Sequence, residues 1–364
     1  MALQLHWFLP SHGDGWDLAE RRDHKPGAKV TRRKPDLGYL AQVARAADQL
    51  GFAGMLTPTG LFCEDAWVVA AALAAQTNRV KFMIALRPGL MSPLVAGQMA
   101  ATFQRISGDR LLLNVVTGGE ADEQRRYGDW LDHDSRYDRT EEFLDLLDRL
   151  WPGDPVDFDG THFRHKAALL ARPPAVPPPI FLGGSSPAAR RVAGRLADVY
   201  LAWGETPGEL GVMFDEVRKR AAEHGRTLQL GTRFNVISRD SADEAWQAAE
   251  RLLRGLEPQT IEAAQRRFAR TESEGQRRMA ALHGGDAGKL VVYPNVWMGF
   301  GLARPGAGAA LVGSHEEVAE RIAEYHAAGA DHLILSGQPH LEEAYSFAEG
   351  VMPLLRRRGI LEPS

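Results

Sequence analysis

The sequence lacks the features of secreted and membrane proteins. It has one cysteine, Cys63, so no disulfide can form within the chain. No apolar run approaches the roughly 18 residues that a membrane span needs. The first residues also lack the basic stretch and apolar segment of a secretory signal. We therefore expect a cytoplasmic protein without membrane contact.

The motifs of several common chemistries are missing as well. No Gly-x-Gly-x-x-Gly follows a predicted strand, which disfavours a dinucleotide-binding unit. There is no His-Glu-x-x-His zinc motif and no Gly-x-Ser-x-Gly nucleophile elbow. His162 and His165 lie three residues apart, but no third ligand joins them in a recognisable metal motif. The formal net charge of -4 gives no reason to expect a nucleic-acid partner.

What the sequence does contain is a regular alternation of apolar runs and helical patterns. With 44% hydrophobic and 25% charged residues, the 364-residue chain can build a full core. Predicted strands cover residues 5–9, 52–56, 80–86, 111–116, 180–182, 199–203, 228–237 and 332–335. Eight such strands alternating with helices predict a (β/α)₈ TIM barrel. An open doubly wound sheet is the competing architecture, but it would usually carry a glycine fingerprint at its cofactor crevice.

We expect residues 1–364 to form a single barrel domain with two departures from the repeat. Residues 22–35 are basic and contain proline, which predicts an exposed loop. Residues 243–313 form an insertion between strands seven and eight, with helices over 245–254 and 260–268. The polar, glycine-bearing stretch 268–285 within it predicts a mobile lid, the alternative being a solvated surface excursion.

The predicted strand ends carry candidate binding residues, because barrel enzymes work at the C-terminal ends of their strands. Gly184, Ser185 and Ser186 follow strand five and open a helix, which suits a phosphate, although a plain capped turn explains them too. Arg233 lies in an apolar strand, where a charge is costly unless it faces a polar cavity. Arg304, in a loop at the end of the insertion, is a second candidate anion binder or a solvated surface residue.

Other candidates are ambiguous from spacing alone. Trp203, at the end of strand six, suits either a binding site or the core. Cys63 suits either a site or an inert buried thiol. His133 and Tyr137 lie at i and i+4, so they share a helical face. They predict either a hydrogen-bonding pair for a ligand or a surface pair.

A series of short motifs in order along nearly the whole chain is similar to the alkanesulfonate monooxygenases, within the bacterial-luciferase-like flavin barrels. Their specificity lies in their number and order. They are WFLPSHGDG at 7–15, PTG at 58–60, CEDAW at 63–67, ALRP at 85–88, NVVTG at 114–118, RY at 136–137, GGSS at 183–186, WGE at 203–205, QRRMAALH at 276–283, GAG at 306–308 and PHLEEAY at 339–345.

The resemblance implies a two-component monooxygenase that uses FMNH₂ and O₂ to release sulfite from an organosulfonate. A separate NAD(P)H-dependent flavin reductase supplies the reduced FMN. The FMN phosphate would lie near Tyr137, Ser185 and Ser186, with Asn114 and Thr117 beside the flavin. The oxygen and sulfonate site would be formed by Cys63, Trp203, Arg233 and Arg304. We also expect a homo-oligomer, either a dimer or a tetramer.

The sequence departs from this family at two strand ends. Asn235 replaces a family histidine in strand seven, and Gln338 replaces a tyrosine after strand eight. Since an amide cannot titrate, the family's proton-handling residue at position 235 is in doubt. Both amides suit hydroxyl groups, and His332, His12 and His340 are further polar candidates for substrate binding. For His332, at the start of strand eight, the alternative is a place at the far end of the barrel. These changes predict a polyhydroxylated substrate such as sulfoquinovose, giving 6-oxo-glucose. Neutral changes in an alkanesulfonate enzyme are the alternative.

Two other functions remain open at this point. One is a deazaflavin-dependent oxidoreductase of the same fold, against which the cysteine and the paired arginines argue. The other is a catalytically inactive flavin-binding or sulfonate-sensing protein, which the intact set of polar strand ends disfavours. Sulfite release with FMNH₂, O₂ and a sulfonate panel separates these possibilities.

Overall fold

The fold is a closed barrel of parallel strands, seen in a computed structural model that describes residues 2–16, 18 and 33–363. The ring closes because β9 pairs with both β8 and β13, and β13 pairs with β1. This confirms the predicted (β/α)₈ barrel and excludes the open sheet. Its strands are β1 (Gln4–Phe8), β2 (Gly54–Thr57), β3 (Lys81–Leu86), β4 (Leu111–Val115), β7 (Ile180–Gly183), β8 (Val199–Trp203), β9 (Gln229–Arg239) and β13 (His332–Ser336).

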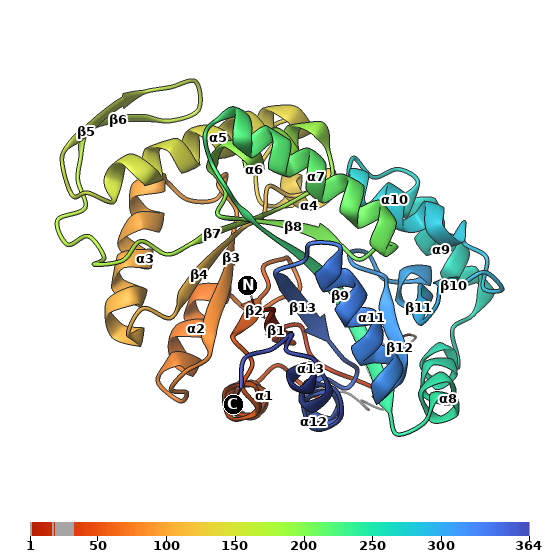
Figure 1. The fold of residues 1–364 in the computed structure, drawn as a ribbon. Helices are drawn as coiled ribbons and strands as arrows, with labels where there is room; N and C mark the ends of the chain where they lie inside the picture. Colours follow the sequence, from red (N-terminus) through yellow and green to blue (C-terminus); the bar gives the residue numbers. More distant parts are fainter. Residues whose placement is uncertain (1, 17, 19–32, 364) are drawn as a thin grey trace.

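Helices surround the barrel on its outer face (Figure 1). Many begin at a short polar side chain that accepts the hydrogen bond of a free backbone N–H, as Asp36 does for α1 and Ser314 for α11. The helices between barrel strands are α1 (Leu37–Leu50), α2 (Ala66–Ala74), α3 (Pro93–Ser107), α4 (Ala121–Arg126), α5 (His133–Leu150), α6 (Pro187–Leu196), α7 (Pro207–Glu223), α8 (Ala242–Leu253) and α11 (His315–Ala327). Helices α12 (His340–Gly350) and α13 (Met352–Arg357) follow the last strand.

Side chains on alternate strand positions divide into two layers. The outward-facing ones pack against the helices in the main core. The inward-facing ones, among them Phe8, Met83, Leu112 and Phe181, form a separate cluster inside the barrel. This apolar layer fills the barrel, so a ligand can approach only from an end of it.

The insertion between β9 and β13 is only partly an excursion from the barrel. It contains the two predicted helices, α8 and α9 (Pro258–Phe268), and then α10 (Glu274–His283), β10 (Val291–Tyr293), β11 (Val296–Trp297) and the short helix η2 (Gly299–Leu302). It ends in β12 (Ala310–Ser314), which pairs in parallel with the C-terminal half of β9. β12 is not among the predicted strands, because its apolar run is short and lies beside a glycine-rich stretch. The hairpin of β5 (Val156–Asp159) and β6 (Arg164–Ala168) is not among them either.

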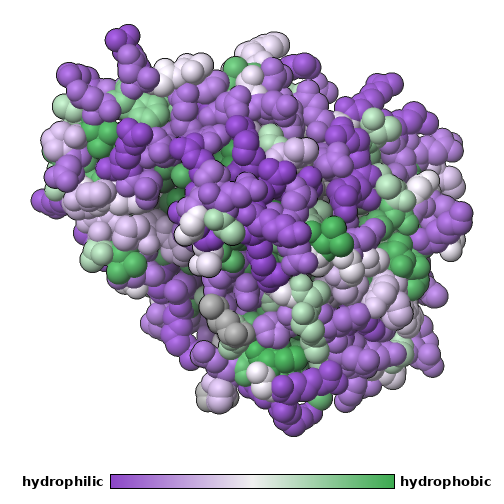
Figure 2. Space-filling view, turned by 45° about the horizontal axis from the view of Figure 1, so that its top comes forward, coloured by the Kyte–Doolittle hydropathy of each residue, from purple (hydrophilic) through white to green (hydrophobic). Residues whose placement is uncertain are grey.

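Two further expectations concern the surface of the protein. Of the predicted exposed loop at 22–35, residues 22–32 lie outside the described residues. Within the described part of the chain, no helix is long and apolar enough to cross a membrane. Figure 2 shows a largely hydrophilic face on which hydrophobic residues form small, separate groups.

Candidate functional site

A pocket of about 270 Å³ lies at the C-terminal ends of the barrel strands. It is bounded by residues from the ends of β2, β3, β4, β7 and β8, by Arg233 within β9, by α5, and by the start of α10. The structure therefore brings many of the predicted site residues together. Those that line the pocket are Asn114, Thr117, His133, Tyr137, Gly184, Ser185, Ser186, Trp203 and Arg233.

One end of the pocket is a cradle suited to an anion. Gly184 has φ +144, and a Cβ there would lie 2.5 Å from the Tyr137 hydroxyl, so the close approach requires glycine. Ser186 caps α6, its Oγ accepting the N–H of Ala189 at 3.2 Å. Ser185 and Ser186, at this helix start, both line the pocket. The motif is a capped turn that also has the geometry of a phosphate site.

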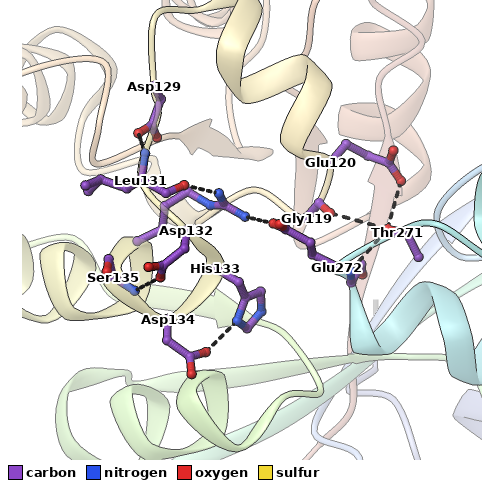
Figure 3. Close-up of polar contacts among 12 residues, drawn as sticks. Gly119, Glu120, Asp129, Leu131, Asp132, His133, Asp134, Ser135, Thr271 and Glu272 are labelled. Atoms are coloured by element: carbon purple, nitrogen blue, oxygen red, sulfur yellow. Dashed lines mark hydrogen bonds and ion pairs between the residues drawn. The ribbon is translucent and has the colours of Figure 1, made fainter.

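Tyr137 adds a hydrogen-bond donor to this cradle. Its hydroxyl reaches Ser186 and Thr117, and burial raises the pKa of Tyr137 to about 12. The hydroxyl therefore stays protonated at neutral pH. The His133 ring packs 5.1 Å from the Tyr137 ring, and its Nδ1 lies 2.7 Å from a carboxylate oxygen of Asp134 (Figure 3). Both members of the i, i+4 pair face the pocket, so the surface-pair alternative is wrong.

The end of β4 supplies two further polar side chains. Asn114 lines the pocket, and its side-chain amide makes no hydrogen bond to another residue in the described part of the chain. Thr117 lies 3.2 Å from Thr140, hydroxyl to hydroxyl. The Asn114 amide can thus pair with a ligand, whereas the Thr117 hydroxyl already takes part in a protein network.

Arg233 faces the pocket from β9 without a carboxylate partner among the described residues. Its guanidinium carbon lies 4.3 Å from the centre of the Phe8 ring, and its Nε is buried without a hydrogen-bond partner. Burial lowers the pKa of Arg233 to about 10, although the nearby Cys63 acts in the opposite direction. The side chain is still charged at neutral pH. An uncompensated charge in such a place attracts an anion strongly.

Trp203 forms the contact between the barrel and the insertion. It ends β8, lines the pocket and is only partly buried, which excludes a plain core role. A Cβ on Gly275 would come within 3.1 Å of its ring, so the start of α10 packs closely over the indole. Ser273 and Gly275 line the pocket on this side. Part of the predicted lid therefore forms a wall of the pocket, while its mobility stays a prediction.

Arg304 and Gln338 form a second group. The Arg304 Nη1 donates a hydrogen bond to the Gln338 Oε1, and the guanidinium lies 5.5 Å from the Phe300 ring. Two predicted substrate-binding residues from different elements thus meet directly. They are not part of the lining of the 270 Å³ pocket.

The side-chain amide of Asn235 is hydrogen-bonded within the protein, which differs from the predicted contact with substrate. Its amide nitrogen donates to the carbonyl oxygens of Ala307 at 3.1 Å and Ala309 at 3.2 Å. Its Oδ1 accepts a hydrogen bond from Ser336 at 2.9 Å. Asn235 lies where β9 begins to pair with β12, and its hydrogen bonds hold the loop that precedes β12. Because both amide hydrogens are in use, the prediction that they read substrate hydroxyls is not supported.

His332 is not brought to the site. It starts β13 and pairs in register with Gln4 at the start of β1, at the opposite end of the barrel from the pocket. Its Nδ1 lies 2.9 Å from the Nε2 of His6, and its Nε2 lies 3.0 Å from the Oε1 of Gln229. The prediction of a substrate contact was wrong, because a residue at a strand start faces the other mouth of the barrel.

His12 and His340 both contact the Phe8 ring. Their ring centres lie 5.9 Å and 5.7 Å from its centre. Asp14 accepts hydrogen bonds from the His340 backbone N–H at 2.7 Å and lies 3.0 Å from its Nδ1. The two histidines are thus grouped with Phe8, the ring that Arg233 also contacts, but they do not line the pocket.

Cys63 lies near this group, on the loop after β2. The thiol is half-buried. It is close enough to both Arg233 and Tyr127 to shift their pKa values upward. It does not line the pocket, so the structure places it beside Arg233 rather than on the pocket wall.

A tether that joins the insertion to the pocket rim was missed. Arg136, with a side chain 1% exposed, forms a 2.8 Å ion pair with Glu272. The Thr271 hydroxyl lies 3.3 Å from the Gly119 carbonyl oxygen and 3.1 Å from a Glu120 carboxylate oxygen (Figure 3). These contacts join segments more than 130 residues apart. No local sequence pattern predicts contacts between residues so far apart in the chain.

Comparison with known proteins agrees with this architecture. Residues 3–332 match the model of the luciferase-like monooxygenase family. Among solved structures, a riboflavin lyase with modified FMN and riboflavin has a TM-score of 0.82 at 21% identity, covering 100% of this chain and 93% of that one. The EDTA monooxygenase of Chelativorans sp. BNC1 has a TM-score of 0.79 at 20% identity, covering 100% and 95%. An F420-dependent secondary alcohol dehydrogenase has a TM-score of 0.72 at 18% identity, covering 98% and 100%.

At these identities the solved structures show a shared fold, whereas the family match extends over most of the sequence. The structural neighbours include one described with modified FMN and one described as F420-dependent. The chain belongs to the luciferase-like monooxygenase family.

Proposed function

We propose that this protein is a two-component monooxygenase that receives reduced FMN from a separate NAD(P)H-dependent reductase and desulfonates an organosulfonate with O₂. The observation that carries the proposal is Arg233, a charged guanidinium facing the pocket without a carboxylate partner among the described residues. A substrate with a permanent negative charge would satisfy it. The adjoining phosphate cradle supplies the place for the cofactor.

The residues of the pocket fit FMN. The glycine turn at Gly184, the α6 start and the Ser185 hydroxyl would hold the phosphate, with Tyr137 donating a further hydrogen bond. Asn114 would face the flavin ring. Bound reduced FMN supplies the two electrons for the activation of O₂. Riboflavin, which has no phosphate, should therefore bind less well than FMN.

The protein groups have distinct parts in the reaction. Arg233 would bind the sulfonate through a fixed fork of donors and a charge that persists at every physiological pH. Arg304, oriented by Gln338, would add a second cation. Trp203 and the start of α10 would exclude water. One oxygen atom of O₂ would be inserted into a C–H bond of the carbon that bears sulfur, and the other would leave as water. The resulting hydroxysulfonate would then lose its C–S bond, giving an aldehyde and sulfite.

For the substrate we propose a polar sugar sulfonate, with sulfoquinovose as the candidate and 6-oxo-glucose as the product. The support is Gln338, a carboxamide at a position where the alkanesulfonate monooxygenases, which this sequence resembles, have a tyrosine. Gln338 contacts Arg304, the second proposed sulfonate-binding residue. Asn235 no longer adds to this support, since its amide is bonded within the protein. Simple alkanesulfonates are the competing substrates.

A deazaflavin enzyme is the second candidate function, because an F420-dependent enzyme shares the fold. Arg233 separates the two, since hydride transfer from an alcohol, or to the corresponding ketone, involves a neutral substrate that offers no anion to Arg233. We propose the oxygen-dependent reaction for this reason.

The test is sulfite release from sulfoquinovose and hexanesulfonate, supplied with FMN, NADH, O₂ and a generic flavin reductase. The expected result is oxygen-dependent sulfite release with a higher kcat/KM for sulfoquinovose. A higher value for hexanesulfonate would overturn the sugar substrate alone. No sulfite from any sulfonate, together with turnover of reduced deazaflavin without oxygen, would overturn the proposed function.

A further inference from the structure

A second cleft, of about 500 Å³, lies beside the pocket and has no part in the proposed reaction. It is formed by α4, by the end of α9 and by the segment that follows. The contacts of Thr271 with Glu120 and of Glu272 with Arg136 lie between the cleft and the pocket. Gly119 and Ser273 line the pocket, whereas their neighbours Glu120 and Glu272 line the cleft.

Arginines dominate the cleft. Arg266, Arg267 and Arg270 come from the end of α9 and the turn after it, and Arg125 approaches from α4. Arg270 forms no ion pair with any carboxylate in the part of the chain that the structure describes. Four guanidinium groups therefore surround one hollow from two elements.

The three carboxylates of the cleft do not cancel this charge. Glu272 is paired with Arg136, a nearly inaccessible residue outside the cleft lining, at 2.8 Å. Glu120 keeps its negative charge, because the hydrogen bond from the Thr271 hydroxyl at 3.1 Å does not neutralise it. Only Asp122 pairs with a cleft arginine, Arg125, at 3.2 Å. With Glu272 matched by Arg136, the four cleft arginines face two other carboxylates, Glu120 and Asp122, so the cleft keeps an excess of positive charge.

The ion pairs that Arg266 and Arg125 form are easily exchanged. Arg266 and Glu262 lie 3.4 Å apart, with side chains 66% and 67% exposed. Arg125 and Asp122 are 54% and 89% exposed. Exposed pairs of this kind contribute at most about 1 kcal/mol. An anion of higher charge can therefore take over these guanidinium groups.

We propose that this cleft is a second oxyanion-binding site, separate from the flavin pocket, for a phosphate group. A phosphate monoester carries close to two negative charges near neutral pH and three oxygens that accept paired N–H donors. Two sources share this chemistry: free inorganic phosphate, and the phosphate of an FMN molecule held outside the pocket. The inference does not depend on the reaction proposed above.

The test is calorimetric titration of the protein with inorganic phosphate at constant ionic strength, both without FMN and with FMN present to occupy the flavin pocket. The double variant R266Q/R270Q should bind phosphate at least about tenfold more weakly, since losing a charge-assisted contact costs roughly 1.5–3 kcal/mol. R125Q, on the opposite wall, should weaken binding in the same direction. The matched control is R251Q/R254Q, which removes two exposed arginines from the end of α8. It should leave binding unchanged.

Further arms separate the sources and the competing explanation. A second equivalent of FMN, but not of riboflavin, should bind if a flavin phosphate is the ligand, whereas binding of inorganic phosphate alone identifies the free ion. An equal loss in the α8 control, no loss in either cleft variant, or no phosphate binding by the wild type would overturn the site. So would tighter binding of an oligoglutamate peptide than of phosphate, because the cleft would then be a docking surface for an acidic protein. Thermal melting checks that each variant is folded.

Discussion

The guanidinium of Arg233 lies over the ring of Phe8, with 4.3 Å between its central carbon and the ring centre. A ring face stabilises a cation without neutralising it. The same ring is contacted by His12 and by His340, which Asp14 holds in place. Phe8 thus fixes the direction of Arg233 while its charge stays available to an anion in the pocket.

We expect the variant R233A to lose more than tenfold in kcat/KM for sulfite release. Removing a charge-assisted contact in a shielded site costs roughly 2–5 kcal/mol. R233K should recover part of the activity, because lysine keeps the charge but not the planar fork. Steady-state sulfite assays measure the effect, with R251Q as the control. Turnover near that of the wild type would remove Arg233 from the site.

The second prediction concerns the phosphate cradle. The variant Y137F removes a buried donor, so FMN should bind about tenfold more weakly, as expected for a lost hydrogen bond to a charged group. Riboflavin binding should change little. Fluorescence titration with both ligands measures the difference, and Y345F, on the far helix α12, is the control. An equal loss for riboflavin would show that Tyr137 acts on the flavin ring or on folding rather than on the phosphate.

Much of the site follows from the sequence because barrel topology does the positioning. Trp203 ends β8 and Ser185 follows β7, whereas Asn114 and Arg233 lie within β4 and β9. Parallel strands bring these positions to one mouth of the barrel. His332 shows the converse case. The same topology assigns it to the other mouth, so a polar residue in a strand is not enough to predict a site.

The errors arise where long-range pairing decides a side chain's use. Asn235 is occupied because β12 pairs beside it, and β12 is too short to stand out in the sequence. The contact between Arg136 and Glu272 is likewise a tertiary pairing. A charge pattern along the chain cannot reveal which of many arginines meets which carboxylate.

The third prediction is a loss of stability in mild acid, caused by the His6 and His332 pair. Burial lowers the pKa of His332 to about 4, and burial together with His332 and Lys81 lowers that of His6. The unfolded chain, with histidine pKa values near 6.5, binds more protons in this window. The two histidines should therefore not reduce the free energy of unfolding above about pH 6.5. Below that pH, the free energy of unfolding should fall as the pH drops toward 4.

Urea unfolding at a series of pH values between these limits measures this effect. The shift at His332 corresponds to about 3 kcal/mol as an order of magnitude. H332Q should flatten the pH dependence, whereas H224Q, which changes an exposed histidine after α7, should not. The same slope in H332Q as in the wild type would assign the acid sensitivity to other groups.

The last prediction is that ligand binding orders the segment 268–285 and that Glu272 restrains it. The start of α10 packs on Trp203, so flavin and sulfonate should reduce tryptic cleavage after Arg277 and Arg278, followed by mass spectrometry. E272Q removes the charge paired with the buried Arg136, and cleavage of the unliganded protein should therefore become faster than in the wild type. E250Q, an exposed change on α8, is the control. Equal cleavage with and without ligands would mean that the segment is a fixed wall of the pocket, and an unchanged rate in E272Q would mean that the tether does not hold it.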